Sequence, residues 1–187
     1  MASLADHPAG DPFGRAPFEQ QAQPGARLAG RYRLERLLRI YPGPHEPHPQ
    51  SWIGFDEVLN RKVGIDVIAS GHPQAPAVEI AARNAANVAD VRFVQVLDVA
   101  SEHGVVYVIK EWIADATDLA TRLADGPLAV PSANKIAQEL TRAIAEAHGY
   151  DMPHGALNPT NILVTSTSEV KVLGLCQIGR ASCRERV

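Results

Sequence analysis

The sequence predicts an α+β fold in which antiparallel strands come first and helices follow. Five stretches before residue 112 carry the alternating or β-branched apolar residues typical of strands, and one helical stretch follows the third. Beyond residue 113 the apolar residues recur at helical spacing. Hydrophobic residues make up 45% of the 187 residues, which is enough to bury a core of ordinary size.

The first part of the chain is expected to form a sheet with one helix. Four prolines between residues 41 and 50 cannot donate hydrogen bonds to a strand ladder, so this stretch is expected to be a loop. Residues 1–29 contain proline, glycine and glutamine and few, aperiodic apolar residues, which predicts a disordered tail. The strands are expected at 32–40, 51–56, 62–69, 93–100 and 105–111, and the helix at 78–89.

The second part is expected to be mainly helical. A short helix is expected at 117–123. A longer helix should begin at Ser132, whose hydroxyl can cap it, and end at Gly149. Two short strands should follow at 162–165 and 170–175. The longer helix has one apolar face, formed by Ile136, Leu140, Ala143, Ile144 and Ala147.

The composition argues against several classes of protein. A net charge of −3 disfavours a nucleic-acid-binding surface, which is usually basic. No apolar run approaches the ~18 residues that span a membrane, and no secretory signal begins the chain. Cys176 and Cys183 lack metal-type spacing, so a reducing cytoplasm is expected. A longer parent protein would still have room for an anchor that holds it on the cytoplasmic face of the membrane.

Three segments, in order along the chain, resemble motifs of protein kinases. The stretch His154-Gly-Ala-Leu-Asn-Pro-Thr-Asn-Ile-Leu163 is similar to the kinase catalytic loop, His-Arg-Asp-Leu-Lys-Pro-Glu-Asn-Ile-Leu. Lys62-Val-Gly-Ile-Asp66 is similar to the third-strand motif Val-Ala-Ile-Lys, and residues 170–176 resemble the strand that leads into Asp-Phe-Gly. The resemblance implies a protein-kinase-like fold with a five-stranded antiparallel amino lobe over 30–112 and a truncated, partial carboxy lobe over 113–177.

The final ten residues, 178–187, continue none of these patterns. They match the translation of a common short-read sequencing adapter, so we expect a non-native segment there. On this interpretation the native sequence is cut just after Gln177, and most of the carboxy lobe is missing.

The departures from the kinase motifs fall on the residues that carry the chemistry. Phosphoryl transfer needs a cation on the phosphates, metal ligands and a carboxylate that orients the attacking hydroxyl. By the resemblance, Asp66 replaces the third-strand lysine, Ala156 the catalytic aspartate and Asn158 the catalytic-loop lysine. Gly174 replaces the metal-binding aspartate, and only Asn161 keeps its polar role. Prolines, which have no amide hydrogen, occupy the place of the glycine-rich loop.

These replacements predict a pseudokinase that regulates or scaffolds a protein partner, similar to degenerate kinase-like domains of actinobacteria. No metal site and no tightly bound cofactor are expected. Backbone groups at Glu111–Ile113, the hinge position that meets adenine in kinases, leave weak ATP binding open, whereas magnesium is not expected. One alternative is an atypical serine/threonine kinase with displaced residues, for which Lys62 and Asp151 are candidates. The other is a nucleotide-sensing module without phosphoryl transfer.

Several of these residues also have purely structural interpretations, which we favour. His154 and Asn161 are expected to hold the hydrogen bonds of their own loop. Asp66 is expected to pair with a nearby base or to lie at an exposed strand end, rather than to act as a new functional carboxylate. His45 and His48 are expected to belong to a solvated loop rather than to a metal site.

Overall fold

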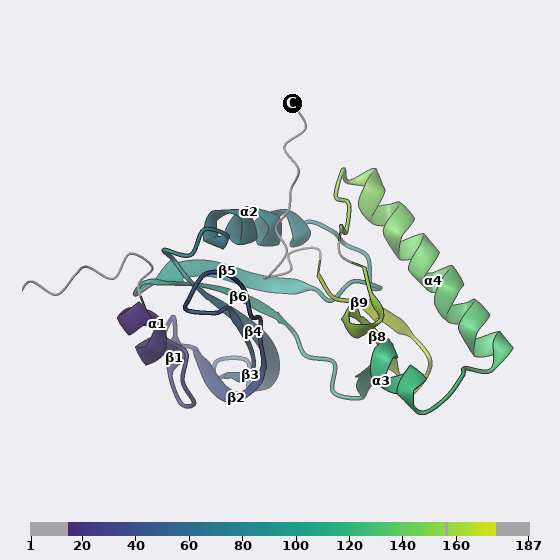
Figure 1. Cartoon of the computed structure of the whole chain (residues 1–187), viewed down its shortest axis with the longest axis horizontal. Coiled ribbons are helices and arrows are strands. Elements are labelled where there is room, and N and C mark those ends of the chain that lie inside the picture. Colours follow the sequence, from purple (N-terminus) through teal and green to yellow (C-terminus); the bar gives the residue numbers. More distant parts are fainter. Residues whose placement is uncertain (1–14, 156, 175–187) are drawn as a thin grey trace, which may run out of the picture.

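The structure, a computed structural model, describes residues 15–155 and 157–174. The predictions made for residues 1–14, Ala156 and residues 175–187 lie outside the described residues. Two antiparallel sheets form the chain's framework, a large one near the amino end and a small one beside helix α4 (Figure 1). The expected α+β arrangement is confirmed.

The large sheet has six strands in the order β1-β2-β3-β4-β6-β5. The five expected strands are present, and a two-residue strand pairs with the first of them. The bounds are β1 Arg27–Leu28, β2 Tyr32–Ile40, β3 Gln50–Asp56, β4 Arg61–Ala69, β5 Val96–Glu102 and β6 Val105–Glu111.

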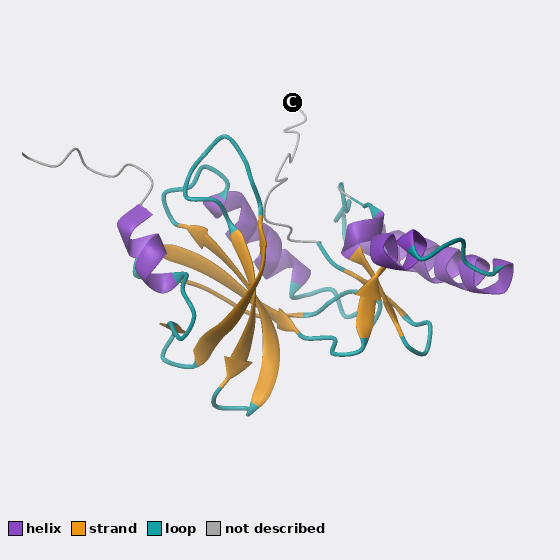
Figure 2. Cartoon of the chain, turned by 60° about the horizontal axis from the view of Figure 1, so that its bottom comes forward, coloured by secondary structure: helices purple, strands orange, loops and turns teal. Residues whose placement is uncertain are grey.

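The small sheet, in the order β7-β8-β9, lies between the large sheet and the long helix (Figure 2). Its strands are β7 Ala116–Asp118, β8 Ile162–Thr165 and β9 Val170–Val172. The helices are α1 Arg15–Gln21, α2 Ala75–Ala85, α3 Leu119–Ala124 and α4 Val130–Gly149, with a 3-10 turn at Pro159–Asn161. None of the described helices is both long and apolar enough to cross a membrane.

Alternation along β4 separates the core into two faces. Val63, Ile65 and Val67 are fully buried in the cluster that also holds Phe18 of α1. The residues between them face the opposite way, where Ile68 packs with α2. Asp66 is therefore directed to the same side of the sheet as α2.

The expected disorder of residues 15–29 is wrong. This segment forms α1 and β1, and it inserts Phe18, which is 2% exposed, and the fully buried Leu28 into the sheet core. Phe18 and Leu28 are isolated apolar residues that pack against strands distant in the sequence. Their segment therefore has no periodic apolar pattern that would predict a helix or strand. Burial of such a side chain contributes about 1.5–3 kcal/mol, which offsets part of the ordering cost of a short segment.

Some predicted element ends also differ from the structure. Helix α4 begins earlier than expected, with Ala129 at the N-cap position and no side-chain cap, so Ser132 does not cap it. A proline in the first turn, where its missing amide costs nothing, favours this earlier start. The fourth strand begins at Val96 rather than at Phe93, because Phe93 instead bridges to Val172 of the small sheet.

This bridge is part of the junction between the two sheets. The Val94 amide donates to the Val172 carbonyl at 2.9 Å, and the Val172 amide donates to the Arg92 carbonyl at 2.7 Å. Phe93, which is 3% exposed, enters a third core cluster with strands β8 and β9 and helix α4. These hydrogen bonds and the packing of Phe93 fix the position of the small sheet relative to the large one, and a cleft lies between the two sheets.

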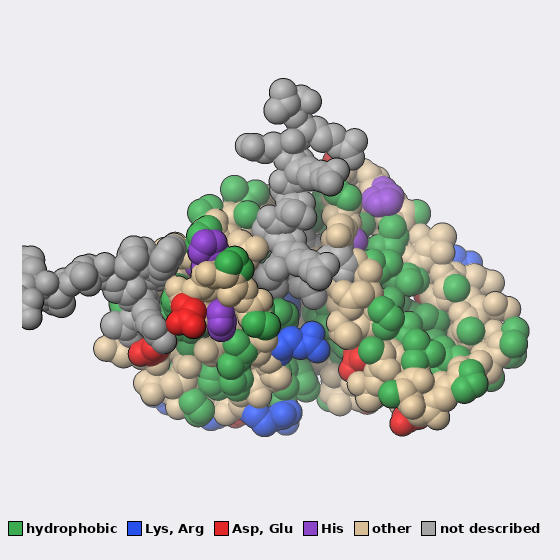
Figure 3. Space-filling model, viewed as in Figure 1, with side chains coloured by type: hydrophobic (Ala, Val, Ile, Leu, Met, Phe, Trp, Pro, Cys, Tyr) green, Lys and Arg blue, Asp and Glu red, His purple; other side chains and the backbone are tan. Residues whose placement is uncertain are grey.

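Helix α4 buries only part of its predicted apolar face. Ile136, Ala143 and Ala147 are buried against the small sheet, whereas Leu140 and Ile144 are half-buried. Figure 3 shows apolar side chains gathered over the part of the molecule that contains α4 and the small sheet.

Candidate functional site

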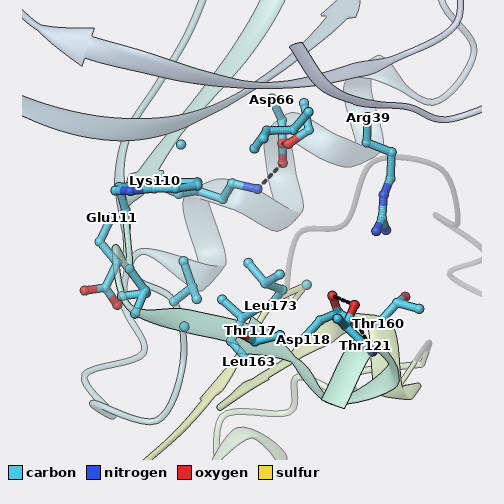
Figure 4. Close-up of a pocket in the computed structure, with 18 of the residues that line it drawn as sticks. Arg39, Asp66, Lys110, Glu111, Thr117, Asp118, Thr121, Thr160, Leu163 and Leu173 are labelled. Carbon is cyan, nitrogen blue, oxygen red and sulfur yellow. Dashed lines mark hydrogen bonds and ion pairs between the residues drawn. The ribbon is translucent and has the colours of Figure 1, made fainter. Parts of the chain in front are cut away.

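The cleft between the two sheets has a volume of about 440 Å³. Strands β2, β3, β4 and β6 form one wall, and the small sheet with the turn before β8 forms the other (Figure 4). The hinge residues Glu111–Ile113 and Gly174 line it. The further lining residues include Leu38, Arg39, Tyr41, Ser51, Asp66, Lys110, Asp118, Thr121, Thr160, Leu163 and Leu173.

Asp66 is a buried, fully engaged carboxylate on the inner wall of this cleft. It is 3% exposed, and its Oδ1 accepts a hydrogen bond from Ser51 Oγ at 2.6 Å. Its Oδ2 pairs with Lys110 Nζ at 2.5 Å. The interpretation of Asp66 as the partner of a nearby base agrees with this geometry.

Lys110 is the cleft cation that sequence reasoning missed. It lies opposite Gly64 on the neighbouring strand, and a Cβ placed on Gly64 would lie 3.8 Å from Lys110 Cε. The lysine stem therefore passes over Gly64 at ordinary van der Waals distance on its way to Asp66. Lys62, the lysine considered from the sequence, is exposed at the start of β4 and does not line the cleft. Antiparallel pairing of residues 61–69 with 105–111 is the signal that could have found Lys110.

The catalytic-loop residues serve the geometry of their own turn. Asn161 is fully buried, and its Oδ1 accepts from the Asn158 amide at 3.0 Å. Asn158 Oδ1 in turn accepts from the amide of Thr160 at 2.9 Å and from its hydroxyl at 2.6 Å. This reciprocal capping fixes the 3-10 turn and agrees with the structural interpretation of Asn161.

His154 is also used structurally. Its Nε2–H donates to the Leu173 carbonyl at 2.7 Å, and the ring is 9% exposed. Burial lowers the pKa of His154, with the opposing effect of backbone hydrogen bonds being smaller. Nδ1 has no hydrogen-bond partner among the described residues, so the neutral ring is the form that this site accommodates.

The other predicted positions supply no carboxylate to the inner cleft. Gly174 lines it without a side chain, and Ala156 lies outside the described residues. Asp151 is exposed just after α4 and does not line the cleft.

Asp118 lies at the outer end of the cleft, where it caps α3. Its carboxylate accepts from the amide of Thr121 at 2.9 Å and from its hydroxyl at 2.7 Å. Burial alone would raise the pKa of Asp118, but the hydrogen bonds from Thr121 outweigh it and leave the pKa below its ordinary value. Arg39, on the opposite wall, contributes a smaller effect in the same direction.

Residues 42–49 of the proline-rich loop are not among the residues that line the cleft. The Tyr41 amide closes its base on the Pro49 carbonyl at 2.8 Å, and the ring of His45 meets that of His72 edge to face at 5.8 Å. Within residues 15–155 and 157–174, no group of three or more His, Cys, Asp or Glu side chains is arranged to hold a metal ion.

The fold consists of two lobes, one built on each sheet, with a cleft between them. No family model matches the sequence. The serine/threonine-protein kinase PrkC of Bacillus subtilis is 26% identical over 152 residues, which cover 79% of this chain and 23% of PrkC. The serine/threonine-protein kinase PknA of Mycobacterium tuberculosis is 27% identical over 157 residues, which cover 79% of this chain and 35% of PknA.

The solved structure of the Mycobacterium tuberculosis PknI kinase domain resembles the chain with a TM-score of 0.65. It is 18% identical, and the match covers 84% of this chain and 63% of that one. The chain is therefore protein kinase-like, with an amino lobe and the beginning of a carboxy lobe. It spans about a quarter to a third of the length of the curated relatives it matches. Since these include proteins of Bacillus and Clostridium, the actinobacterial affiliation stays a prediction.

Proposed function

We propose that this chain is a catalytically inactive, protein-kinase-like regulatory module that acts by binding a protein partner. The observation that carries the proposal is the internal neutralisation of the cleft. The position expected to hold a phosphate-binding lysine holds Asp66, which is tied to Lys110 and Ser51 inside the protein.

The magnitudes favour loss of phosphoryl transfer. Two unit charges 4 Å apart interact by about 4 kcal/mol at an effective dielectric of 20, so a carboxylate in place of a cation turns a gain of that order into a penalty. Loss of a general base typically costs ~10²–10⁴-fold in rate. Gly174 offers no side-chain carboxylate to a metal ion at the position where the kinase resemblance places one.

The relatives named serine/threonine-protein kinase support the kinase-like fold of the module. The absence of phosphoryl transfer is our proposal. A module without transfer activity keeps a folded surface that a partner can recognise. We therefore propose that neither a tightly bound cofactor nor magnesium is needed for its role.

A phosphotransfer assay tests this proposal. The chain is incubated with magnesium and ATP labelled on the γ-phosphate, with the kinase domain of PrkC as the positive control. We expect label on neither the chain nor a general protein substrate. Incorporation of label into the chain or the substrate would refute the proposal, in favour of the atypical kinase.

A further inference from the structure

The proline-rich loop, residues 42–49, joins β2 to β3 and carries two histidines that the proposed function leaves without a role. The ring of His45 meets the ring of His72, in the connection between β4 and α2, edge to face at 5.8 Å. The Nδ1–H of His48 donates to the His45 carbonyl at 3.2 Å. These three residues, the histidine cluster, attach the loop to the connection that precedes α2.

His72 is the buried member of the histidine cluster, with 4% of its surface exposed. Its Nδ1 accepts a hydrogen bond from the Gln74 amide at 3.2 Å, and the ring also hydrogen-bonds to the His45 backbone. A neutral imidazole has one nitrogen that donates and one that accepts, whereas both nitrogens of the protonated ring donate. Protonation of His72 therefore points two N–H groups at each other at Gln74, and that hydrogen bond is lost.

The charges around the histidine cluster also oppose protonation of His72. Burial lowers the pKa of His72, and the charges of His45 and His48 lower it further, while the hydrogen bond with the His45 backbone opposes them by a smaller amount. Glu46, the carboxylate of the loop, lies with its Oε1 3.9 Å from His48 Nε2. It can thus compensate a charge on His48 but does not contribute to the pKa of His72.

Charged side chains of the adjoining strand and helix are paired with other residues. Asp66 of β4 pairs with Lys110, and Glu79 of α2 pairs with Arg83. None of the carboxylates that the structure describes contributes to the pKa of His72. A proton on this ring therefore has neither an acceptor for its second N–H nor a counter-charge.

We propose that the histidine cluster is a pH-sensitive latch, which holds the proline-rich loop while His72 is neutral and releases the loop at its base when His72 is protonated. The closed loop accommodates only the neutral ring, whereas in the open loop the ring takes up a proton with its ordinary pKa of 6.5. The closed state is therefore favoured above pH 6.5 and loses stability as the pH falls below it. This inference goes beyond the proposed function, which involves no change of pH.

Native-state hydrogen exchange of the whole chain, followed by NMR, tests the proposal with two amides. The Gln74 amide reports the hydrogen bond to His72, and the Tyr41 amide reports the base of the loop, which it closes on the Pro49 carbonyl at 2.8 Å. One histidine that is protonated only in the open state favours opening by about tenfold as the pH falls from about 7.5 to about 5.5. We expect the protection factors of both amides to fall together by about this factor.

Two variants assign the effect to His72. His72→Asn should abolish the pH dependence at both amides, because the Asn oxygen can accept from Gln74 but takes up no proton in this range. His148→Asn is the matched control, since His148 is exposed near the end of α4, and it should keep the tenfold change.

Protection factors that do not change with pH, a fall at Gln74 without one at Tyr41, or a tenfold change that remains in His72→Asn would overturn the proposal. The NMR titration of the His72 ring in the parent chain is a second measurement that needs no variant. We expect its midpoint below pH 6.5, and a midpoint at or above that value would overturn the proposal as well.

Discussion

Removal of the Lys110 charge should strongly destabilise the amino lobe. The Lys110–Asp66 pair spans 2.5 Å between side chains that are 14% and 4% exposed, so its Coulomb energy is about 6–7 kcal/mol at an effective dielectric of 20. Desolvation offsets much of that gain, but loss of one partner leaves a buried carboxylate uncompensated. We expect Lys110→Met to lower the free energy of unfolding by about 3–5 kcal/mol, against a typical domain total of about 5–15 kcal/mol.

Urea denaturation of the variants measures this effect. The double variant Asp66→Asn/Lys110→Met should recover most of the loss, because no buried charge then lacks a partner. Arg83→Met is the control, since it breaks the exposed Arg83–Glu79 pair of α2 and should cost about 0.5 kcal/mol or less. A loss below about 1 kcal/mol in Lys110→Met, or no recovery in the double variant, would refute the reasoning.

Three other changes test the fold. Phe18→Ala should lower the free energy of unfolding, measured by urea denaturation, by about 3–5 kcal/mol because it leaves a cavity at a buried site. A change near zero would instead support a disordered tail. Asp56→Asn should cost about 2 kcal/mol at pH 7, since Arg31 holds the pKa of Asp56 at about 2; in the parent that stability is present above pH 3.8 and lost toward pH 2. Burial lowers the pKa of His154, so the parent should lose stability as pH falls below 6.5, and His154→Gln should weaken that dependence in pH-dependent melting curves.

Most of the strands could be located from the sequence because apolar alternation follows directly from the side chains. Residues 105–111 and 162–165 form strands with the predicted bounds. The ends that were missed, such as the start of α4, depend on local capping and on contacts from elsewhere in the chain. The folding of α1 could not be predicted from the sequence. The helix is held to the sheet by Phe18, and the site that receives Phe18 is formed by distant strands.

The candidate site was predictable in position but not in its electrostatics. The kinase resemblance placed Asp66, Gly174 and the hinge at the cleft, and the structure brings all three there. It gave no reason to consider Lys110 or Arg39, because neither stands at a motif position. Their role depends on which strands are neighbours and on which face each side chain occupies.

The sequence by itself determined which side chains stand at the positions that resemble kinase motifs. By that resemblance Asp66 stands where a lysine is expected and Gly174 where a carboxylate is expected, whatever the packing. The tertiary structure decided how the remaining charges are satisfied. Asp66 and Lys110 are far apart in the chain, and only the pairing of β4 with β6 places them 2.5 Å apart. Electrostatic energy depends on distance and burial, and the folded chain alone sets both.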